Sequence, residues 1–300
     1  MVTAIINMLK RNPLIWKTAK ALVYAVLALK GWWLAAWHGL GAKYGSAAGV
    51  CAAKREIPLV VSFTSYGHRI LRSHITAQTI LRQSLKADRV ILWLGHGEKI
   101  TPQLEKLSRR GLEIRYTEDI RAYTKIIPTL VNCPGSIVVT ADDDIIYPKN
   151  WLKKLWEEHL AAPDQICCHR AHVITKTLTG TVKPYNEWEW CVRRSERTAA
   201  IFPTGVGGVL YPPGSLHPTV TDIAMFKELC PYADDIWLKA MSLRQGTVCR
   251  IVARKPLLIP LSSPGTQSQS ALRVINIDEN RNDEQFRAVF THYDLYKLLD

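Results

Sequence analysis

Three consecutive aspartates, Asp142, Asp143 and Asp144, follow an apolar stretch that reads SIVVTA. A short apolar run predicts a buried strand, so the three carboxylates stand together at its carboxyl end. Such carboxylates repel one another, and a divalent cation relieves the repulsion. Side chains alternate along an extended backbone, which places Asp142 and Asp144 on one side and Asp143 on the other. We therefore expect Asp142 and Asp144 to bind Mn²⁺ or Mg²⁺ and to leave positions for diphosphate oxygens. The competing interpretation is a helix-capping turn before Pro148, for which one aspartate suffices.

A second acidic pair, Asp234 and Asp235, opens a segment whose pattern predicts a helix from Asp235 to about Arg244. An aspartate at this position can simply cap the helix. Alternatively, a carboxylate at the helix start faces a substrate hydroxyl and removes its proton as a general base. The residues alone leave both interpretations open.

Five short motifs resemble those of nucleotide-sugar-dependent glycosyltransferases of the GT-A fold. The likeness is to the family-2-like enzymes of bacterial polysaccharide and lipopolysaccharide synthesis. The order and spacing of the motifs over roughly 58–260 are fairly specific, although each motif alone is weak. They are TSYGHR at 64–69, Lys125, DDDIIYP at 142–148, PTGVGGVLYPP at 203–213 and ADDIWL at 233–238.

The resemblance implies metal-dependent transfer of a sugar from a nucleotide diphosphate donor, with a UDP-sugar favoured, to a hydroxyl of a surface-glycan or lipid-linked acceptor. It makes Asp235 the base of an inverting reaction and gives Asp234 a role in orienting the acceptor. His217, after the glycine segment, is a candidate third metal ligand beside Asp142 and Asp144. Contacts to the nucleotide sugar are expected from Thr64, Tyr66, Arg69, Lys125, Asp142, Asp143, Gly207 and Gly208.

Two features weaken parts of this resemblance. Many family members carry an Asp-rich turn after the second strand that reads the nucleotide base, whereas this chain has GHGE at 95–98. The glycines of 205–208 do not form GxGxxG, so they indicate either close approach of backbone to a sugar or a plain turn.

Other segments have both a functional and an ordinary interpretation. CCHRAH at 167–172 is a weak zinc candidate, and a strand that brings Arg170 or His172 to the site is favoured over it. Trp188 and Trp190 stack on a sugar ring or pack in the core. The polar stretch 262–284 predicts a mobile loop, whose arginines, Arg273 and Arg281, either close over the diphosphate or remain solvated.

The rest of the body predicts the elements that hold these residues. Strand patterns cover 58–64, 89–94, 112–116 and 136–140, and helical patterns cover 73–85, 101–110, 122–131 with a break near Pro128, and 151–161. This alternation predicts an α/β fold with a mostly parallel sheet and helices on both faces, and its ligands bind at the carboxyl ends of the strands. With the resemblance, 58–161 becomes the nucleotide-sugar-binding half of a Rossmann-like GT-A fold. Residues 162–300 become an irregular α+β half that binds the acceptor and carries the catalytic pair.

Residues 1–50 form a basic, apolar leader, joined to the body by a predicted linker at 42–57. Residues 1–55 contain eight Lys and Arg and no Asp or Glu. The apolar run 21–29 is too short to span a bilayer, but a run through Lys30 to the tryptophans at 32, 33 and 37 is long enough. We expect a helix in the inner-leaflet interface, on the cytoplasmic face of the inner membrane. The alternatives are a single span with Lys30 reaching the interface, or a helix pair packed on the body.

Composition narrows the class of protein. The chain has 300 residues, 47% of them hydrophobic and 22% charged, which excludes a disordered or fibrous chain. Seven cysteines without a CxxC pair indicate a reducing compartment.

Two alternative functions remain possible from the sequence. One is a metal-dependent nucleotidyl- or phosphotransferase, which would not need Asp235, and the other is a non-enzymatic membrane or nucleic-acid binder. The net charge of +13 suggests the latter, but the leader carries eight of the basic residues, so we expect no nucleic-acid partner.

Overall fold

A seven-stranded sheet forms the centre of the protein in the computed structural model, which describes residues 13–53, 55–193, 199–253, 256–261 and 281–299. The strand order is β10-β6-β9-β4-β1-β2-β3, and every neighbouring pair is parallel except those that β9 makes with β4 and β6. Two further pairs, β5–β11 and β7–β8, are antiparallel. The strands are β1 Leu59–Thr64, β2 Arg89–Gly95, β3 Leu112–Thr117, β4 Ile137–Thr140, β5 Ile145–Ile146, β6 Ile166–Cys168, β7 Ala171–Val173, β8 Ile201–Pro203, β9 Val209–Tyr211, β10 Cys249–Ile251 and β11 Ile259–Pro260.

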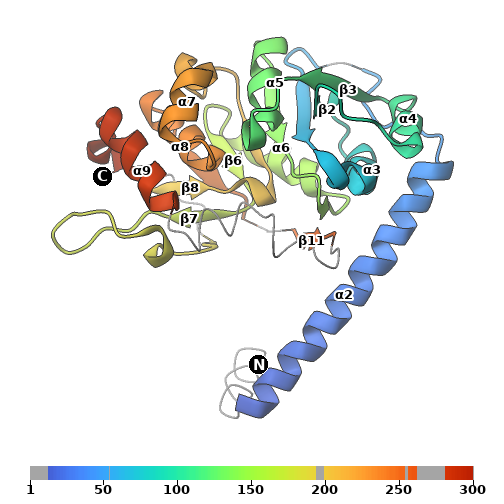
Figure 1. The fold of residues 1–300 in the computed structure, drawn as a ribbon, viewed down its shortest axis with the longest axis horizontal. Coiled ribbons are helices and arrows are strands. Elements are labelled where there is room, and N and C mark those ends of the chain that lie inside the picture. The colour runs from blue at the N-terminus through green and yellow to red at the C-terminus, as the bar shows by residue number, and fades with distance from the viewer. Residues whose placement is uncertain (1–12, 54, 194–198, 254–255, 262–280, 300) are drawn as a thin grey trace.

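Helices cover both faces of this sheet, as the sequence predicts (Figure 1). They are α2 Pro13–Tyr44, α3 Ile70–Leu81, α4 Pro102–Ser108, α5 Ile127–Asn132, α6 Trp151–Ala161, α7 Ile223–Leu229, α8 Asp234–Arg244 and α9 Arg281–His292. Neighbouring residues of one strand enter opposite cores. Val139 belongs to the core that includes residues of α3, α4 and α6, and Val138 to the core that includes residues of α5, α7, α8 and α9. Burial on both faces explains why the central strands are continuously apolar. The architecture is consistent with a Rossmann-like GT-A fold.

The helix boundaries show where the sequence pattern was inexact. Thr101 caps α4, as expected, and accepts a hydrogen bond from the Leu104 N–H at 3.3 Å. The helix predicted at 73–85 instead runs from Ile70 to Leu81. The predicted break near Pro128 is present: a 3₁₀ helix covers Arg121–Lys125 and α5 starts at Ile127, with Pro128 in its first turn, where its missing N–H costs nothing.

The N-terminal helix α2 extends away from the body over much of its length (Figure 1). It is, among the described helices, the one that is long and apolar enough to cross a membrane, over Trp16–Tyr44. Its C-terminal part lies on α3 and α4.

The segment after α2 is not a free linker. The predicted linker at 42–57 begins inside α2, and the backbone that follows is bonded to the body: the Gly49 N–H donates to the Arg110 carbonyl at 2.8 Å and the Cys51 N–H to the Ala87 carbonyl at 2.7 Å. The two predicted halves also share one sheet, because β6, β9 and β10 come from 162–300. The division into 1–50, 58–161 and 162–300 stays a prediction.

Candidate active site

A cleft of about 680 Å³ lies at the carboxyl ends of the parallel strands, where the sequence places the ligand. The structure brings most of the predicted site residues together here. Those that line the cleft are Thr64, Tyr66, Arg69, Lys125, Asp142, Asp143, Asp144, Asp234 and Asp235.

The aspartate turn separates its three carboxylates. Asp143 is buried and accepts hydrogen bonds from Ser65 Oγ at 2.6 Å and from Arg69 Nε at 3.1 Å. The side chains of Asp142 and Asp144 are 23% and 43% exposed. The predicted separation therefore holds, but its cause differs, because residues 143–144 form a turn rather than a continued strand.

Asp142 and Asp144 form a donor set that fits a divalent cation. Burial and the nearby Asp142 carboxylate raise the pKa of Asp144 to about 6, although Arg69 opposes this. The negative charges of Asp142 and Asp144 therefore lie on one wall of the cleft, and Arg69 neutralises them only in part. Among the described residues no group of three or more His, Cys, Asp and Glu side chains is placed to hold a metal. A cation here would be held by these two carboxylates, with its other positions open to phosphate oxygens and water.

Lys125 joins this turn to the second acidic pair. It is 8% exposed, and its Nζ lies 3.3 Å from Asp142 Oδ1 and 3.0 Å from Asp234 Oδ2. Burial lowers the pKa of Lys125, but the carboxylates of Asp234 and Asp142 outweigh burial and hold it well above its usual value. The lysine is therefore a permanent cation between two acidic groups that lie more than ninety residues apart in sequence.

Asp235 is not a helix cap. The position before α8 is Ala233, and no side chain caps the helix there. Instead, the Asp235 carboxylate accepts a hydrogen bond from the Gly205 N–H at 3.0 Å. Burial and the neighbouring Asp234 raise its pKa to about 7, while Lys125 and the Gly205 N–H oppose the shift. A carboxylate with this pKa can both hold and release a proton near neutral pH, as a general base must.

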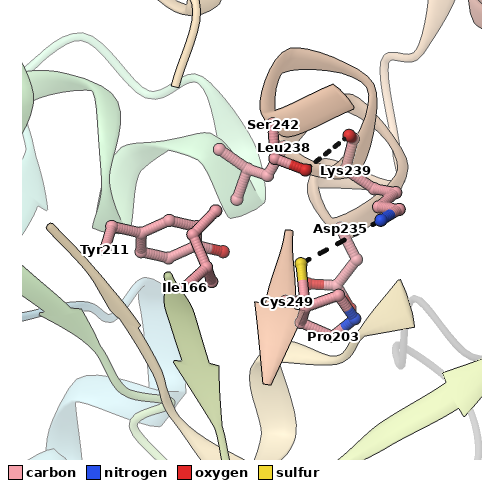
Figure 2. Close-up of a pocket in the computed structure, with 8 residues that line it drawn as sticks. All are labelled: Ile166, Pro203, Tyr211, Asp235, Leu238, Lys239, Ser242 and Cys249. Atoms are coloured by element: carbon pink, nitrogen blue, oxygen red, sulfur yellow. Dashed lines mark hydrogen bonds between the residues drawn. The ribbon is translucent and has the colours of Figure 1, made fainter. Parts of the chain in front are cut away.

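A second cavity, of about 10 Å³, also borders Asp235 (Figure 2). Lys239 and Cys249 line it, and their Nζ and Sγ atoms lie 4.0 Å apart. The cavity has room for about one water molecule. A substrate must therefore approach Asp235 from the large cleft.

The glycine segment contributes differently from the prediction. Gly205 faces the cleft, and a Cβ at this position would lie 2.9 Å from Lys125 Nζ. Gly207 and Gly208 do not line it: the Gly207 carbonyl accepts from Trp151 Nε1 at 2.8 Å, and a Cβ on Gly208 would lie 2.5 Å from the Trp151 ring. These two glycines serve packing.

His217 is not brought to the aspartates. It precedes a 3₁₀ turn at Pro218–Thr221, and its Nδ1 lies 2.9 Å from Thr219 Oγ1. It is not among the residues that line the cleft. The structure therefore offers Asp142 and Asp144 without this third ligand.

CCHRAH at 167–172 spans the end of β6 and the start of β7, and it is not part of any metal-holding group among the described residues. Cys167 and Cys168 enter the two cores on opposite faces of the sheet. Arg170 and His172 line the cleft, as the favoured interpretation predicts. Of the two tryptophans, Trp188 is buried in the core, and Trp190 lines the cleft and is 40% exposed.

Several lining residues escaped the sequence analysis. Asp119 lies at the carboxyl end of β3, where the sheet rule expects ligands, but neither it nor Arg121 was among the predicted site residues, because this strand end carries no motif. The Arg121 N–H donates to Asp119 Oδ1 at 2.8 Å, and the Arg121 guanidinium lies 4.4 Å from the ring centre of Tyr232. Arg281 lies over the same ring at 5.3 Å and begins α9, so it is helical rather than part of a loop. Arg273 lies outside the described residues.

Comparison with known proteins gives structural likenesses only. No protein-family model and no curated protein matches the chain. The inositol-1-phosphate CTP transferase of T. maritima is 8% identical with a TM-score of 0.41, over 75% of this chain and 97% of that one. The mannosyltransferase PcManGT of Pyrobaculum calidifontis, solved with GDP-Man and Mn²⁺, is 14% identical with a TM-score of 0.47, over 89% of this chain and 74% of that one. At these values the likenesses assign no role to any residue of this chain.

Proposed function

We propose that this protein is a metal-dependent glycosyltransferase. It moves a sugar from a nucleotide diphosphate donor, with a UDP-sugar favoured, to a hydroxyl of a surface-glycan or lipid-linked acceptor, with inversion at the anomeric carbon. The observation that carries the proposal is the Lys125 bridge. Lys125 contacts both Asp142 and Asp234, and the same cleft is lined by Asp144 and by Asp235, whose pKa is about 7. This supports Asp142 and Asp144 as the cation ligands and Asp235 as the base.

The donor side of the cleft is the aspartate turn. Asp142 and Asp144 would hold Mn²⁺ or Mg²⁺, which when bound neutralises the diphosphate and makes it a better leaving group. Arg69 is already paired with Asp143 and lies 3.1 Å from Asp144, so its main effect is to fix the turn. Lys125 and Arg121 add positive charge to the same cleft.

In the proposed reaction one bond forms, one bond breaks and one proton is transferred. The acceptor hydroxyl attacks the anomeric carbon as the bond from that carbon to the diphosphate oxygen breaks. The hydroxyl proton passes to the Asp235 carboxylate, and the nucleoside diphosphate leaves. Lys125, held 3.0 Å from Asp234, favours the ionised form of the Asp235 base, whereas the neighbouring Asp234 carboxylate raises the pKa of Asp235 and keeps it close to neutral pH.

The acceptor side is aromatic. Trp190, Tyr185 and His172 line the cleft, and the ring centres of Trp190 and His172 lie 4.7 Å apart. The partly exposed indole of Trp190, in the same cleft as the proposed base, provides an apolar face for a sugar ring. The exposed apolar surface of α2, including Trp33 and Trp37, supports a location at the cytoplasmic face of the inner membrane, where a lipid-linked acceptor would lie.

Product analysis with matched variants tests this proposal. The full-length protein would be incubated with Mn²⁺, with UDP-sugars or GDP-mannose as donors, and with alkyl glycosides as acceptors. We expect a new glycoside and a nucleoside diphosphate, lost in Asp142→Asn, Asp144→Asn and Asp235→Asn. Asp294→Asn, on an exposed side chain paired only with Lys297 among the described residues, should keep full activity. Pyrophosphate release with Asp235→Asn fully active would instead indicate a nucleotidyltransferase.

A further inference from the structure

The strand β11 connects the aspartate turn to the N-terminal helix. β11 pairs with β5, which begins directly after Asp144. The N–H of Leu261, the residue after β11, donates to the Asp144 carbonyl at 2.7 Å. From the other side, Thr76 Oγ1 lies 2.8 Å from the Asp143 carbonyl. The backbone of the turn is therefore held between α3 and β11.

The helix α2 in turn covers β11. Gly31 lies against the strand so closely that a Cβ there would be 3.1 Å from Ile259 Cγ2. Ala35 forms a small buried cluster with Ile75, Ile146, Ile259 and Leu261. The cluster thus joins α2, α3, β5 and β11 directly behind Asp144.

The position of α2 along the body is fixed at its C-terminal end. Arg110 donates to the carbonyls of Gly41 at 3.2 Å and Ala47 at 2.9 Å. Ala42 is fully buried, and a Cβ on Gly41 would lie 2.7 Å from Gln78 Nε2. The helix is therefore locked in register from about Gly31 onward.

The preceding part of α2 is more exposed. Most of its described apolar side chains face solvent, including Leu22 at 66% and Leu29 at 70%. In this one continuous helix, the part before Gly31 is available to lipid, and the part from Gly31 onward supports the aspartate turn. Because a helix is stiff over this length, a shift of the outer half is transmitted to Gly31 and Ala35.

We propose that α2 is a positioning element of the cation and diphosphate site as well as an anchor. Through Gly31, Ala35 and β11 it holds the Asp144 backbone where the Asp144 carboxylate meets a cation shared with the donor diphosphate. The inference rests on the proposed function, because it concerns the same site. It makes bilayer attachment and donor binding energetically coupled.

Thermal unfolding of the full-length protein in detergent, titrated with Mn²⁺ at fixed UDP, tests the coupling. Gly31→Leu places a side chain against Ile259, and Ala36→Leu makes the same kind of change on the exposed side of the helix. We expect Gly31→Leu to need at least fivefold more Mn²⁺ for half of the stabilisation, and Ala36→Leu to match the wild type. Ile259→Val keeps Cγ2 at the contact with Gly31 but removes the Cδ1 methyl group from the buried cluster behind Asp144, and it should shift the requirement about twofold in the same direction.

The outcomes separate the two proposals. If UDP with Mn²⁺ does not stabilise the wild type although another nucleoside diphosphate does, the titration is run with that nucleotide. If no nucleoside diphosphate with Mn²⁺ stabilises the wild type, the proposed function is refuted and this inference with it. If the wild type responds and both Gly31→Leu and Ile259→Val have the wild-type Mn²⁺ requirement, the inference alone is refuted. Should Gly31→Leu fail to fold, Ile259→Val decides the result.

Discussion

Replacing Asp235 with asparagine should inactivate the protein and at the same time stabilise its fold. Ionising the Asp235 carboxylate costs free energy, because burial and Asp234 raise its pKa from 3.8 to about 7. Asparagine removes the charge and still accepts the hydrogen bond from the Gly205 N–H. A gain in stability with a loss of activity is the signature of a residue kept for function.

The magnitude follows from the pKa. At about 1.4 kcal/mol for each pKa unit, a rise from 3.8 to about 7 corresponds to about 4 kcal/mol at most. Partial solvent access screens the charge, so we expect about 2 kcal/mol, or roughly 4–8 °C in melting temperature. The folded state holds the proton that the unfolded state releases between pH 4 and 7. The advantage of the variant is therefore absent near pH 4, grows as the pH rises, and is complete above pH 7.

Melting temperatures of the wild type and Asp235→Asn from pH 4 to 8 measure this. Asp88→Asn is the control, because the buried Asp88 carboxylate accepts from the Leu59 N–H at 2.7 Å and pairs with Arg55 at 2.9 Å. That variant should lose stability rather than gain it. A melting temperature of Asp235→Asn equal to or below that of the wild type at pH 8 would refute the reasoning.

Four further predictions follow from the geometry. Mn²⁺ affinity, measured by nucleotide-dependent stabilisation, should fall as the pH drops through about 6, because the cation must displace the proton from Asp144. Lys125→Met should lower stability by about 3–5 kcal/mol in denaturant titration, because it leaves buried carboxylates uncompensated. Gly208→Ala should cost more than about 2 kcal/mol and give little folded protein, since its φ is +89° and its Cβ would meet Trp151 at 2.5 Å. In steady-state assays, Trp190→Ala should raise the acceptor KM about tenfold and leave the donor KM unchanged, and an unchanged acceptor KM would remove Trp190 from the acceptor site.

The central sheet was predictable because its strands are buried on both faces. β1, β2 and β4 appear as short apolar runs between turn residues, whereas β3, which reads LEIRYT, is a half-buried edge strand. The structure places all four within one residue of the predicted ends. The strand β11 was not predicted. A strand of two residues shows no periodicity in the sequence. The role of β11 also depends on its contacts with α2 and β5, which are distant in sequence.

The acidic residues of the site were predicted better than its glycines and histidines. Asp142, Asp144 and Asp235 follow a strand or open a helix, so their position in the fold follows from the element. Which glycine of 205–208 faces the cleft depends on the Trp151 side chain, which packs against Gly208 and leaves Gly205 toward Asp235. His217 is separated from the aspartates by a turn whose direction the sequence does not encode locally.

The most direct test of the central claim is thermal unfolding of the full-length protein with UDP, GDP, CDP and ADP, each with and without Mn²⁺. A nucleotide at 100 times its dissociation constant stabilises the fold by about 2.7 kcal/mol, which is easily measured. We predict that one nucleoside diphosphate, most strongly UDP, stabilises the wild type only with Mn²⁺, and that Asp144→Asn abolishes the shift. Stabilisation by no nucleotide, or a shift that persists in Asp144→Asn, would contradict the account.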